Sequence, residues 1–467
     1  MAAPPSSSAE TTEFTALKEI LAPAIYSAVT FRADSPMTGL PTADKEVTMR
    51  KQLIVAAVAL SAMTLAGCTG GTGGGGGDSD PDSIRFLIGQ PEDNADLDLT
   101  KADLAAFTEA TGIEVKLDVV PSENMRTVLQ TQLRSGEGPD VFGYDTGPGF
   151  AGALEEAGLL YDLTDAYADN DWPIYDFAQE RVTFGGKIVG IPNDIESVGL
   201  FYNKDIFDSL GLAQPETLDD LTAAADVIRD SGVIPFAVSD KEGWQGGHLL
   251  SMVLSSEVGG DAMEGLIAGD TSWESPEVVD ALDVLASYNS DGLFTPSPTA
   301  VTYDNANALF YSGKAAINPT GSWLAQDIER NVDFGVGYIP FPAQDGPGIF
   351  SGGLGSGLFI SATTTKADAA IKFLDWNVTQ EHGRWQVEEQ QSIPAFPVDT
   401  EGIEATPLFT QIIADAAKIA DGTGDFGYNV DVLMSDTFNE AMWDGIQAIL
   451  TGQKDADQVA ADLEKNF

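Results

Sequence analysis

The sequence predicts an α/β fold built from two lobes, and three observations support this prediction. Short apolar runs with strand character alternate with helices that carry one apolar face, a pattern typical of largely parallel sheets. Residues 68–467 are too many for one typical domain and suit two lobes of roughly 150 to 200 residues each. Hydrophobic residues make up 43% of the chain, so a sizeable core is available.

The first predicted elements form a strand–helix–strand unit. Ile84–Ile88 is a short apolar run with strand character, and Leu99–Thr111 is predicted as a helix that ends at Gly112. Ile113–Val120 is predicted as the second strand and Asp140–Phe142 as the third. This order indicates the start of a sheet with helical connections.

Thr217–Ser231 is the best-marked helix of the chain. Thr217 is placed as its N-cap, with Asp220 three residues further on, and Gly232 ends it. Its apolar stripe, which predicts one buried face, consists of Leu218, Leu221, Ala225 and Ile228.

A strand and a further helix are predicted next. Val233–Val238 returns to strand character, and Ser275 and Pro276 open another helix, with Gly292 beyond its end. The apolar face of that helix is formed by Val278, Leu282 and Leu285. No fixed-period repeat is found along the chain, so we expect packed lobes rather than a repeat array.

Residues Met49–Cys68 resemble a bacterial lipoprotein signal. Arg50 and Lys51 give a positive start, and Leu53–Ala66 is an apolar core of signal-peptide length that is short for a bilayer span. Leu65–Cys68 supplies the small residues that a signal peptidase needs and ends on the only cysteine. The resemblance implies a lipid on Cys68 and a mature chain held outside the cytoplasmic membrane.

The segments around this signal divide the N-terminal region into three. Residues 1–48 are expected to be a misassigned upstream segment, because a signal peptide must lead the nascent chain, and 49–67 are the signal peptide. Residues 68–82 are the lipidated cysteine and a tether rich in glycine over 70–77. The alternative is an N-terminal transmembrane anchor with a chance cysteine.

The strong acidity of the chain excludes some partners. The net charge is −50, from 73 acidic and 23 basic residues, so a nucleic-acid partner is excluded because phosphate contacts require Lys and Arg. An anionic membrane surface would repel the chain, so lipid has to supply the attachment. With Cys68 lipidated, no thiol is left for a disulfide, and we interpret the acidity as a solvated surface.

Motifs of common enzymes and metal sites are missing. The chain has no GxxxxGK[ST] phosphate loop and no GxSxG elbow, and its two histidines, His248 and His382, lack a recognisable local partner. We expect both histidines to be surface or packing residues. The sequence therefore predicts neither catalytic activity, nor a metal site, nor a cofactor.

Several segments in a fixed order resemble the extracellular solute-binding proteins of ABC sugar importers, the group that includes maltose-binding proteins. They extend over about 300 residues. They are GPDVF (138–142), AGLLYDLT (157–164), GKIVGIP (186–192), LFYNKD (200–205), FYSGKAAI (310–317) and GSW (321–323).

The resemblance implies a two-lobed periplasmic-binding-protein-like fold of type II, with a ligand cleft between lobes joined by crossing strands. It places the crossings near Asp194–Val198, Gly352–Leu358 and Ser392–Pro397. Lobe 1 is then expected over 83–194 plus 350–391, and lobe 2 over 198–348 plus 395–467. The glycines of 351–355 suit a segment that rotates between lobes or lets backbone approach a ligand, or alternatively form an ordinary turn.

A sugar offers apolar ring faces and a rim of hydroxyls, so its site needs aromatic surfaces, carboxylates and amides. Trp244 is predicted in a glycine-rich loop after Val233–Val238, and Trp323 matches a binding Trp of the family. Tyr144 and Asp145 follow the strand at 140–142, at the end where α/β sheets bind ligands. The further candidates are Asp194, Glu196, Gln90, Glu92, Asp93, Gly353, Tyr428 and Asn429. Trp172, Trp376 and Trp443 are expected to pack in the lobes.

The resemblance implies a non-enzymatic role: a monomer that captures a carbohydrate and delivers it to the transmembrane permease subunits of an ABC transporter. Amides and acids suit a neutral oligosaccharide, and few basic residues lie near the cleft motifs, which disfavours an acidic sugar. The alternatives are the same fold with a non-sugar solute, an extracellular glycan-active enzyme, and an adhesin or sensor without transport.

Overall fold

The computed structural model describes residues 83–91, 94–420 and 425–467. The predicted signal at 49–67, Cys68 with its tether, and the candidates Glu92 and Asp93 lie outside these ranges. Among the helices that are described, none combines the length and the apolar character needed to cross a membrane.

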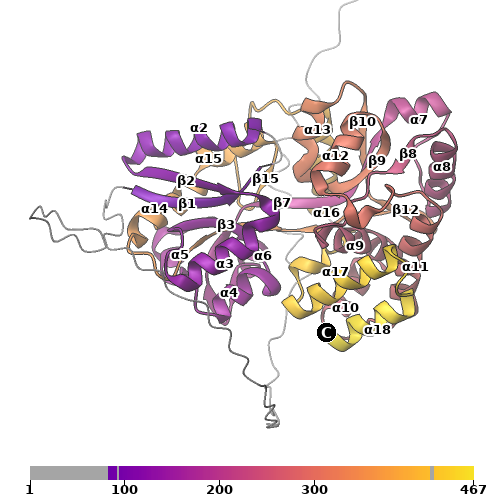
Figure 1. Cartoon of the computed structure of the whole chain (residues 1–467). Helices are drawn as coiled ribbons and strands as arrows, with labels where there is room; N and C mark the ends of the chain where they lie inside the picture. The colour runs from indigo at the N-terminus through magenta and orange to yellow at the C-terminus, as the bar shows by residue number, and fades with distance from the viewer. Residues whose placement is uncertain (1–82, 92–93, 421–424) are drawn as a thin grey trace, which may run out of the picture.

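Two lobes lie side by side, each around its own sheet (Figure 1). The sheet of lobe 1 has the strand order β2-β1-β3-β14-β6. Its strands are β1 (Ser83–Gly89), β2 (Glu114–Val120), β3 (Val141–Asp145), β6 (Gly190–Pro192) and β14 (Ser356–Ile360). Strands β1, β2 and β3 are parallel, whereas β14 runs antiparallel to both β3 and β6. The carboxyl ends of the parallel strands therefore meet at one edge.

Alternation along the strands of lobe 1 creates a core on each face of the sheet. Phe86 and Val141 pack on one face and Leu87 and Phe142 on the other, because successive side chains of a strand point to opposite sides. The first core is covered by α2 (Asn94–Thr111) and α14 (Ala367–Asn377), through residues such as Leu104, Phe107, Phe373 and Leu374. The second is covered by α3 (Met125–Ser135), η3 (Pro148–Gly152) and α4 (Ala153–Glu156), through Leu129, Leu133, Phe150 and Leu154.

The smaller elements of lobe 1 surround this sheet. They are η2 (Ser122–Asn124), α5 (Thr164–Asn170), α6 (Asp176–Glu180), the hairpin of β4 (Thr183–Phe184) and β5 (Lys187–Ile188), and α15 (Gln380–Trp385).

The six-stranded sheet of lobe 2 is organised around one long strand, β7 (Asp194–Asn203). Its order is β10-β7-β9-β8, and β13 and β15 pair with β7 off this path. The other strands are β8 (Ile234–Phe236), β9 (Ala315–Gly321), β10 (Val336–Ile339), β13 (Ser351–Gly353) and β15 (Ile393–Pro394). A separate hairpin joins β11 (Phe341–Ala343) to β12 (Gly346–Ile349).

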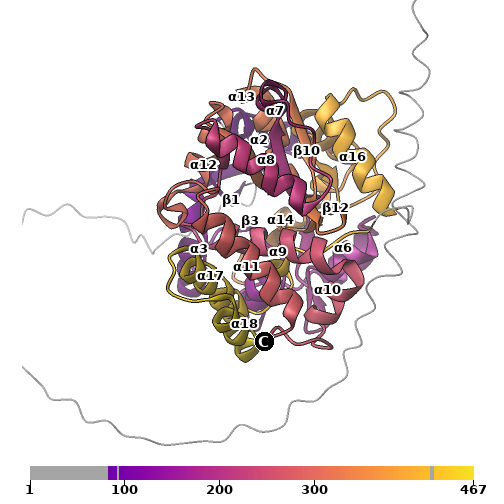
Figure 2. The same cartoon turned by 90° about the vertical axis from the view of Figure 1, so that its right-hand side faces the viewer.

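Helices cover both faces of the lobe 2 sheet. One core is lined by α8 (Leu218–Asp230), α9 (Trp244–Val258), α11 (Pro276–Ser290), α17 (Asp436–Leu450) and α18 (Ala456–Asn466). The other is lined by α12 (Tyr303–Tyr311), α13 (Ala325–Asn331) and α16 (Pro407–Ala420). The view in Figure 2 places α9, α10, α11, α17 and α18 in the lower half of the lobe and α7, α8, α12 and α13 above them. The remaining elements are α7 (Lys204–Leu210), α10 (Gly260–Ile267), η4 (Pro298–Ala300), η5 (Ser322–Leu324), η6 (Gln386–Gln390) and η7 (Val430–Val432).

The chain passes between the lobes at three places. Strand β6 of the lobe 1 sheet runs almost directly into β7, and β13 of the lobe 2 sheet is followed by β14 of the lobe 1 sheet. The third passage is less direct than the expected one. Val387 and Ile393 already pack in a lobe 2 core, and Ala395, Phe396 and Val398 then return to the lobe 1 core instead of opening lobe 2. The chain rejoins a lobe 2 core from Ile403 onward.

Most predicted elements are present with shifted ends. The helix predicted over 217–231 is α8, and the side chain of its N-cap Thr217 accepts a hydrogen bond from the backbone N–H of Asp220. The predicted loop position of Trp244 is wrong, because Trp244 is the first residue of α9. Helix α9 has 15 residues and is buried almost all round. It therefore shows no apolar stripe with a polar face opposite, the pattern by which a surface helix is recognised in a sequence.

Candidate functional site

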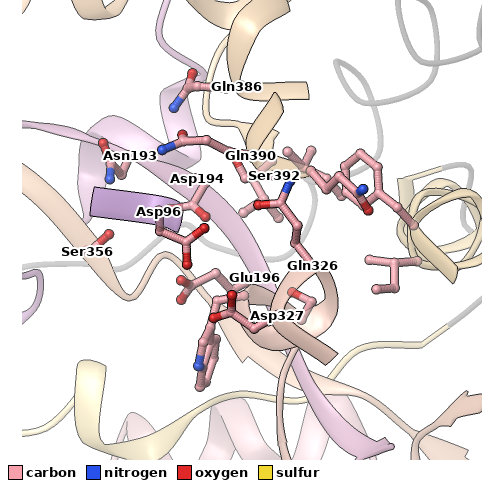
Figure 3. A pocket seen from close by; sticks show the side chains of 17 residues that line it. Asp96, Asn193, Asp194, Glu196, Gln326, Asp327, Ser356, Gln386, Gln390 and Ser392 are labelled. Carbon is pink, nitrogen blue, oxygen red and sulfur yellow. The ribbon is translucent and has the colours of Figure 1, made fainter. Parts of the chain in front are cut away.

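A pocket of about 250 Å³ lies between the two lobes, beside the crossing strand β7. Lobe 1 contributes Asp96 from the start of α2 and Ser356 from β14. Lobe 2 contributes four residues of 322–327 and the residues around β15. Figure 3 shows carboxyl and amide side chains gathered around it. The lining is Asp96, Asn193, Asp194, Ile195, Glu196, Ser322, Trp323, Gln326, Asp327, Ser356, Gln386, Gln390, Gln391, Ser392, Ile393, Phe409 and Ile412.

Asp194 and Glu196 bring two carboxylates from β7 into this pocket. They are two residues apart on one strand, so both point to the same side. Burial raises the pKa of Asp194 to about 6, although Ser356 donates a hydrogen bond that opposes this. Burial, and then the charges of Asp194 and Asp145, raise the pKa of Glu196 well above its usual range. Glu196 can take this position because Gly355, whose backbone N–H bonds to it, has no side chain to collide with its carboxylate.

Tyr144 and Asp145 end strand β3 at the edge that faces lobe 2. Tyr144 is buried against Phe150, and its hydroxyl has no hydrogen-bond partner in the described part of the chain. Asp145 keeps some exposed surface, but the surrounding protein removes part of its hydration. This desolvation, and then the charge of Asp431, raise the pKa of Asp145 to about 7. The charge of His248 opposes the shift. The charges of Asp431 and His248 of lobe 2 therefore act on Asp145 of lobe 1.

Four rings of lobe 2 form an aromatic cluster consisting of Trp244, His248, Tyr303 and Trp323. The ring of Trp244 lies 4.9 Å from both His248 and Tyr303, measured between centroids, and His248 lies 5.7 Å from Trp323. The indole N–H of Trp323 donates to the Tyr303 hydroxyl at 2.9 Å. Both indoles are only half-buried, and Trp323 lines the pocket.

Asn429 and Asp431 approach this cluster from the C-terminal segment. The Asn429 amide lies 2.9 Å from Nε2 of His248, and Oδ2 of Asp431 lies 3.5 Å from the same nitrogen. Both side chains are nearly fully buried. Oδ1 of each has no partner among the described residues, so the two atoms are unused hydrogen-bond acceptors.

The structure brings together most, but not all, of the residues predicted from the sequence. Asp194, Glu196 and Trp323 line the pocket, and Tyr144, Asp145, Trp244 and Asn429 lie around the neighbouring charges and rings. Gly353 pairs with Glu196 across two strands. Gln90 is exposed and bonded near β2, and the Tyr428 hydroxyl donates to Glu264 on α10, so neither lies with the others.

Sequence reasoning missed several residues of the site. His248 was expected to be a packing or surface residue, yet it contacts Trp244, Trp323, Asn429 and Asp431. Its spacing of four from Trp244 places both on one face of a helix and would have found it once the helix was recognised. Asp96, Tyr303 and Asp327 carried no comparable signal, since acids are abundant and the tyrosine comes from a separate helix.

Contacts between the lobes lie on two sides of the cleft. Arg330 of α13 forms an ion pair with Asp96 of α2, and Arg126 of α3 forms one with Asp436 of α17. Near the second pair, the Phe150 ring lies 6.3 Å from the Trp443 ring. In Figure 1, α2 and α13 lie above the crossing strand β7, and α3 and α17 lie below it. No grouping of His, Cys, Asp and Glu within 83–91, 94–420 and 425–467 is arranged to hold a metal ion.

A pocket of polar side chains between two lobes, with strands that cross from one lobe to the other, defines a two-lobed solute-binding protein. The chain belongs to the family of bacterial extracellular solute-binding proteins, whose model matches residues 93–382, more than half of its length. This family is a binding family located outside the cytoplasm.

Individual relatives agree with this assignment. An uncharacterised ABC transporter extracellular-binding protein of Pyrococcus horikoshii is 30% identical over 47% of this chain, and the chain spans only 51% of that relative's length. A multiple sugar-binding protein of Streptococcus mutans is 26% identical over 74% of this chain and 81% of its own. Among solved structures, a chitin oligosaccharide binding protein superposes with a TM-score of 0.72 at 24% identity, covering 82% of this chain and 98% of its own, which shows the fold.

Proposed function

We propose that this protein captures a carbohydrate in the interlobe pocket and delivers it to the membrane permease of an ABC transporter. The observation that carries the proposal is the combination, in one pocket between two lobes, of a half-buried indole, carboxylates and several amides. Trp323 offers a flat face to a sugar ring, while Glu196, Gln326 and Gln390 can accept from or donate to its hydroxyls. The sugar-binding relative from Streptococcus mutans supports the same ligand class.

Binding would act through closure of the lobes. A ligand that contacts Glu196 on the crossing strand, Asp96 of lobe 1 and Trp323 of lobe 2 favours the conformation in which all three are close. Shifting a mostly open population to a mostly closed one requires a preference of about 5 kcal/mol for the closed state. The closed form is the one we expect the permease to recognise, with no covalent chemistry on the sugar.

We further propose that lipid on Cys68 holds the mature chain at the outer face of the cytoplasmic membrane, as a monomer. The motif at 49–68 and the extracytoplasmic location of the family support this. Mass spectrometry of the native protein tests it: the N-terminal peptide should begin at Cys68 and carry a diacylglycerol mass. A tryptic peptide from upstream of Met49 would contradict the assignment of residues 1–48.

The ligand class is tested by a thermal-shift screen of the full-length chain against mono- and oligosaccharides, with amino acids and phosphates as controls. A ligand that binds only the folded state raises the melting temperature with concentration. The shift should be lost in Trp323→Phe and kept in Trp376→Phe. Trp376 is a matched control because it is also half-buried and donates its indole N–H, to Asp103, but packs against Phe107 within lobe 1. A shift by a non-sugar solute alone would overturn the carbohydrate assignment.

A further inference from the structure

Four carboxylates from both lobes gather around the crossing segment 352–356. Glu196 pairs with Gly353 and Asp145 with Ser356 across neighbouring strands, and the backbone N–H of Asn429, two residues before Asp431, donates to the Gly352 carbonyl. Asp194 and Glu196 come from the crossing strand β7, Asp145 from the end of β3 in lobe 1, and Asp431 from η7 in lobe 2. The charges of Asp194, Asp145 and Asp431 all act on Glu196, and the charge of Asp431 acts on Asp145. Ionised carboxylates whose charges act on one another repel, so the ionised form of this cluster is costly unless a cation joins it.

The nearby cations are engaged elsewhere. Arg330 pairs with Asp96 and Asp327 at the pocket edge, and Arg126, whose charge also acts on Asp145, pairs with Asp436. The pocket itself is lined by no Lys or Arg. Over the described parts of the chain, no ion pair engages the carboxylates of Asp145, Asp194 or Glu196. Of the protein's own cations, His248 lies beside the cluster, 3.5 Å from Oδ2 of Asp431. Burial raises the pKa of Asp145, Asp194 and Glu196, so a cation bound among them would hold these three carboxyl groups in the ionised form.

The unused polar atoms beside these carboxylates are acceptors. Oδ1 of Asp431 and Oδ1 of Asn429 lack partners among the described residues, and their side chains are 3% and 6% exposed. A carboxylate or carbonyl oxygen can only accept, so the group that binds here has to donate. Buried acceptors of this kind are stabilised when a ligand satisfies them.

We propose that the solute captured by this protein is an amino sugar whose protonated amine binds among Asp145, Asp194, Glu196 and Asp431. An ammonium group has three donors and no acceptor and carries the missing positive charge. The sugar ring would still pack on the indole of Trp323, as proposed above. An ammonium group near Trp244 would also be attracted to the face of that indole. The inference rests on the proposed carbohydrate function. It replaces the neutral sugar expected from the sequence, because that expectation did not consider the four carboxylates together.

Matched pairs of ligands test the proposal by isothermal titration calorimetry on the full-length chain. The pairs are glucosamine with glucose, galactosamine with galactose, and the fully deacetylated chitosan dimer with cellobiose; spermidine is the non-sugar cation. We expect at least one amine to bind about tenfold or more tightly than its neutral partner, a difference of about 1.4 kcal/mol. Raising the salt concentration to 0.5 M should lower this affinity ratio, because salt screens the attraction between the ammonium group and the carboxylates.

Each result decides between the proposals. Neutral sugars that bind as tightly as their amines, or more tightly, overturn the amino-sugar inference and leave the carbohydrate function standing. Binding of spermidine with silence from all six sugars overturns both. Silence from all three amines counts against the inference, whichever neutral sugar binds.

Variants locate the charge effect. In Glu196→Gln the amine-to-neutral affinity ratio should fall toward one, because the carboxylate next to the ammonium loses its charge but keeps its shape. If that variant does not fold, Asp145→Asn tests the same cluster from the other lobe. Glu277→Gln is the matched control, since it removes one exposed carboxylate from α11 and should leave the ratio unchanged. An unchanged ratio in both Glu196→Gln and Asp145→Asn overturns the assignment of the amine to this cluster.

Discussion

The indole of Trp323 can lie in the cleft because residue 321 has no side chain. A Cβ at Gly321 would overlap the six-membered ring of Trp323, so Gly321→Ala must displace the indole. We expect a loss of about 1–3 kcal/mol of stability from the overlap, together with weaker sugar binding. Urea denaturation and calorimetry measure the two effects. Gly346→Ala is the control, because a Cβ there meets nothing within 4 Å, and equal behaviour of the two variants would contradict the argument.

Asp240 is a buried acid whose ionisation opposes folding. Burial, and then the charge of Glu242, outweigh the hydrogen bond from Gly246 and raise its pKa to about 8. Between pH 4 and pH 8 the folded state keeps a proton that the unfolded state has released, so this residue's contribution to stability falls as the pH rises. Its Oδ2 also lacks a partner among the described side chains.

Asp240→Asn should therefore gain stability over wild type as the pH rises, on the order of a few kcal/mol between pH 5 and pH 8.5. The amide oxygen can still accept from the backbone N–H of Gly246, which Oδ1 of Asp240 does at 2.9 Å. Urea denaturation of both chains at the two pH values gives the comparison. Asp270→Asn is the control, because it removes an exposed acid with the same change in net charge. The difference between its free energy of unfolding and that of wild type should not change with pH.

The sequence predicted individual site residues where a local pattern pointed to them. Trp323 was found from its GSW segment, and Asp194 and Glu196 from their place at a crossing. His248 was missed because it lies in a helix buried almost all round, in which neither periodicity nor a polar face marks it. Tyr303 and Asp431 were missed because their proximity to the cluster depends on tertiary packing between segments far apart in the chain.

At the scale of elements, prediction worked where local physics decides the conformation. Gly112, which was predicted to end the helix at 99–111, follows α2 in a left-handed conformation with φ of 76°. The strands of lobe 1 show the alternation expected of a sheet covered on both faces. The irregular elements at the cleft were not predicted. The segment η3 at 148–152 is a π-turn rich in glycine, and β15 has two residues, so neither leaves a periodic signal.

Two helix starts that look alike in sequence differ in the structure. The Thr217 side chain accepts a hydrogen bond from the Asp220 backbone at the start of α8, whereas Ser275 makes no such bond at the start of α11. Thr217→Ala should therefore cost about 1 kcal/mol of stability. Ser275→Ala should cost clearly less, which makes it the control in the same denaturation experiment. Equal losses would mean that the hydroxyl bond is not what stabilises α8.

At the scale of the whole molecule, the contacts between the lobes combine ion pairs with a small area of packing. Apart from the crossing strands, they include the ion pairs Arg126–Asp436 and Arg330–Asp96 and the packing of η3 on η7 and α17. Exposed ion pairs each contribute about 0–1 kcal/mol, so they hold the lobes together weakly. A weak interface of this kind allows a ligand to decide between open and closed arrangements.

Close backbone approach at η3 makes this interface sensitive to a single methyl group. A Cβ at Gly149 of lobe 1 would lie 2.9 Å from the Met434 carbonyl and from Nδ2 of Asn439, both in lobe 2. Gly149→Ala should therefore hold the lobes apart while each lobe stays folded. Since the apparent dissociation constant rises as the closed population falls, sugar binding should weaken.

Small-angle X-ray scattering and calorimetry together test this variant. With the tightest-binding sugar of the calorimetric series at saturation, wild type should become more compact, and Gly149→Ala should compact less and bind about tenfold more weakly, or about 1.4 kcal/mol. Gly346→Ala, which adds the same methyl group within the β11–β12 hairpin, should follow wild type. If Gly149→Ala compacts fully and binds as wild type does, the close approach of η3 to α17 plays no part in closure, and the ligand contacts alone set the closed population.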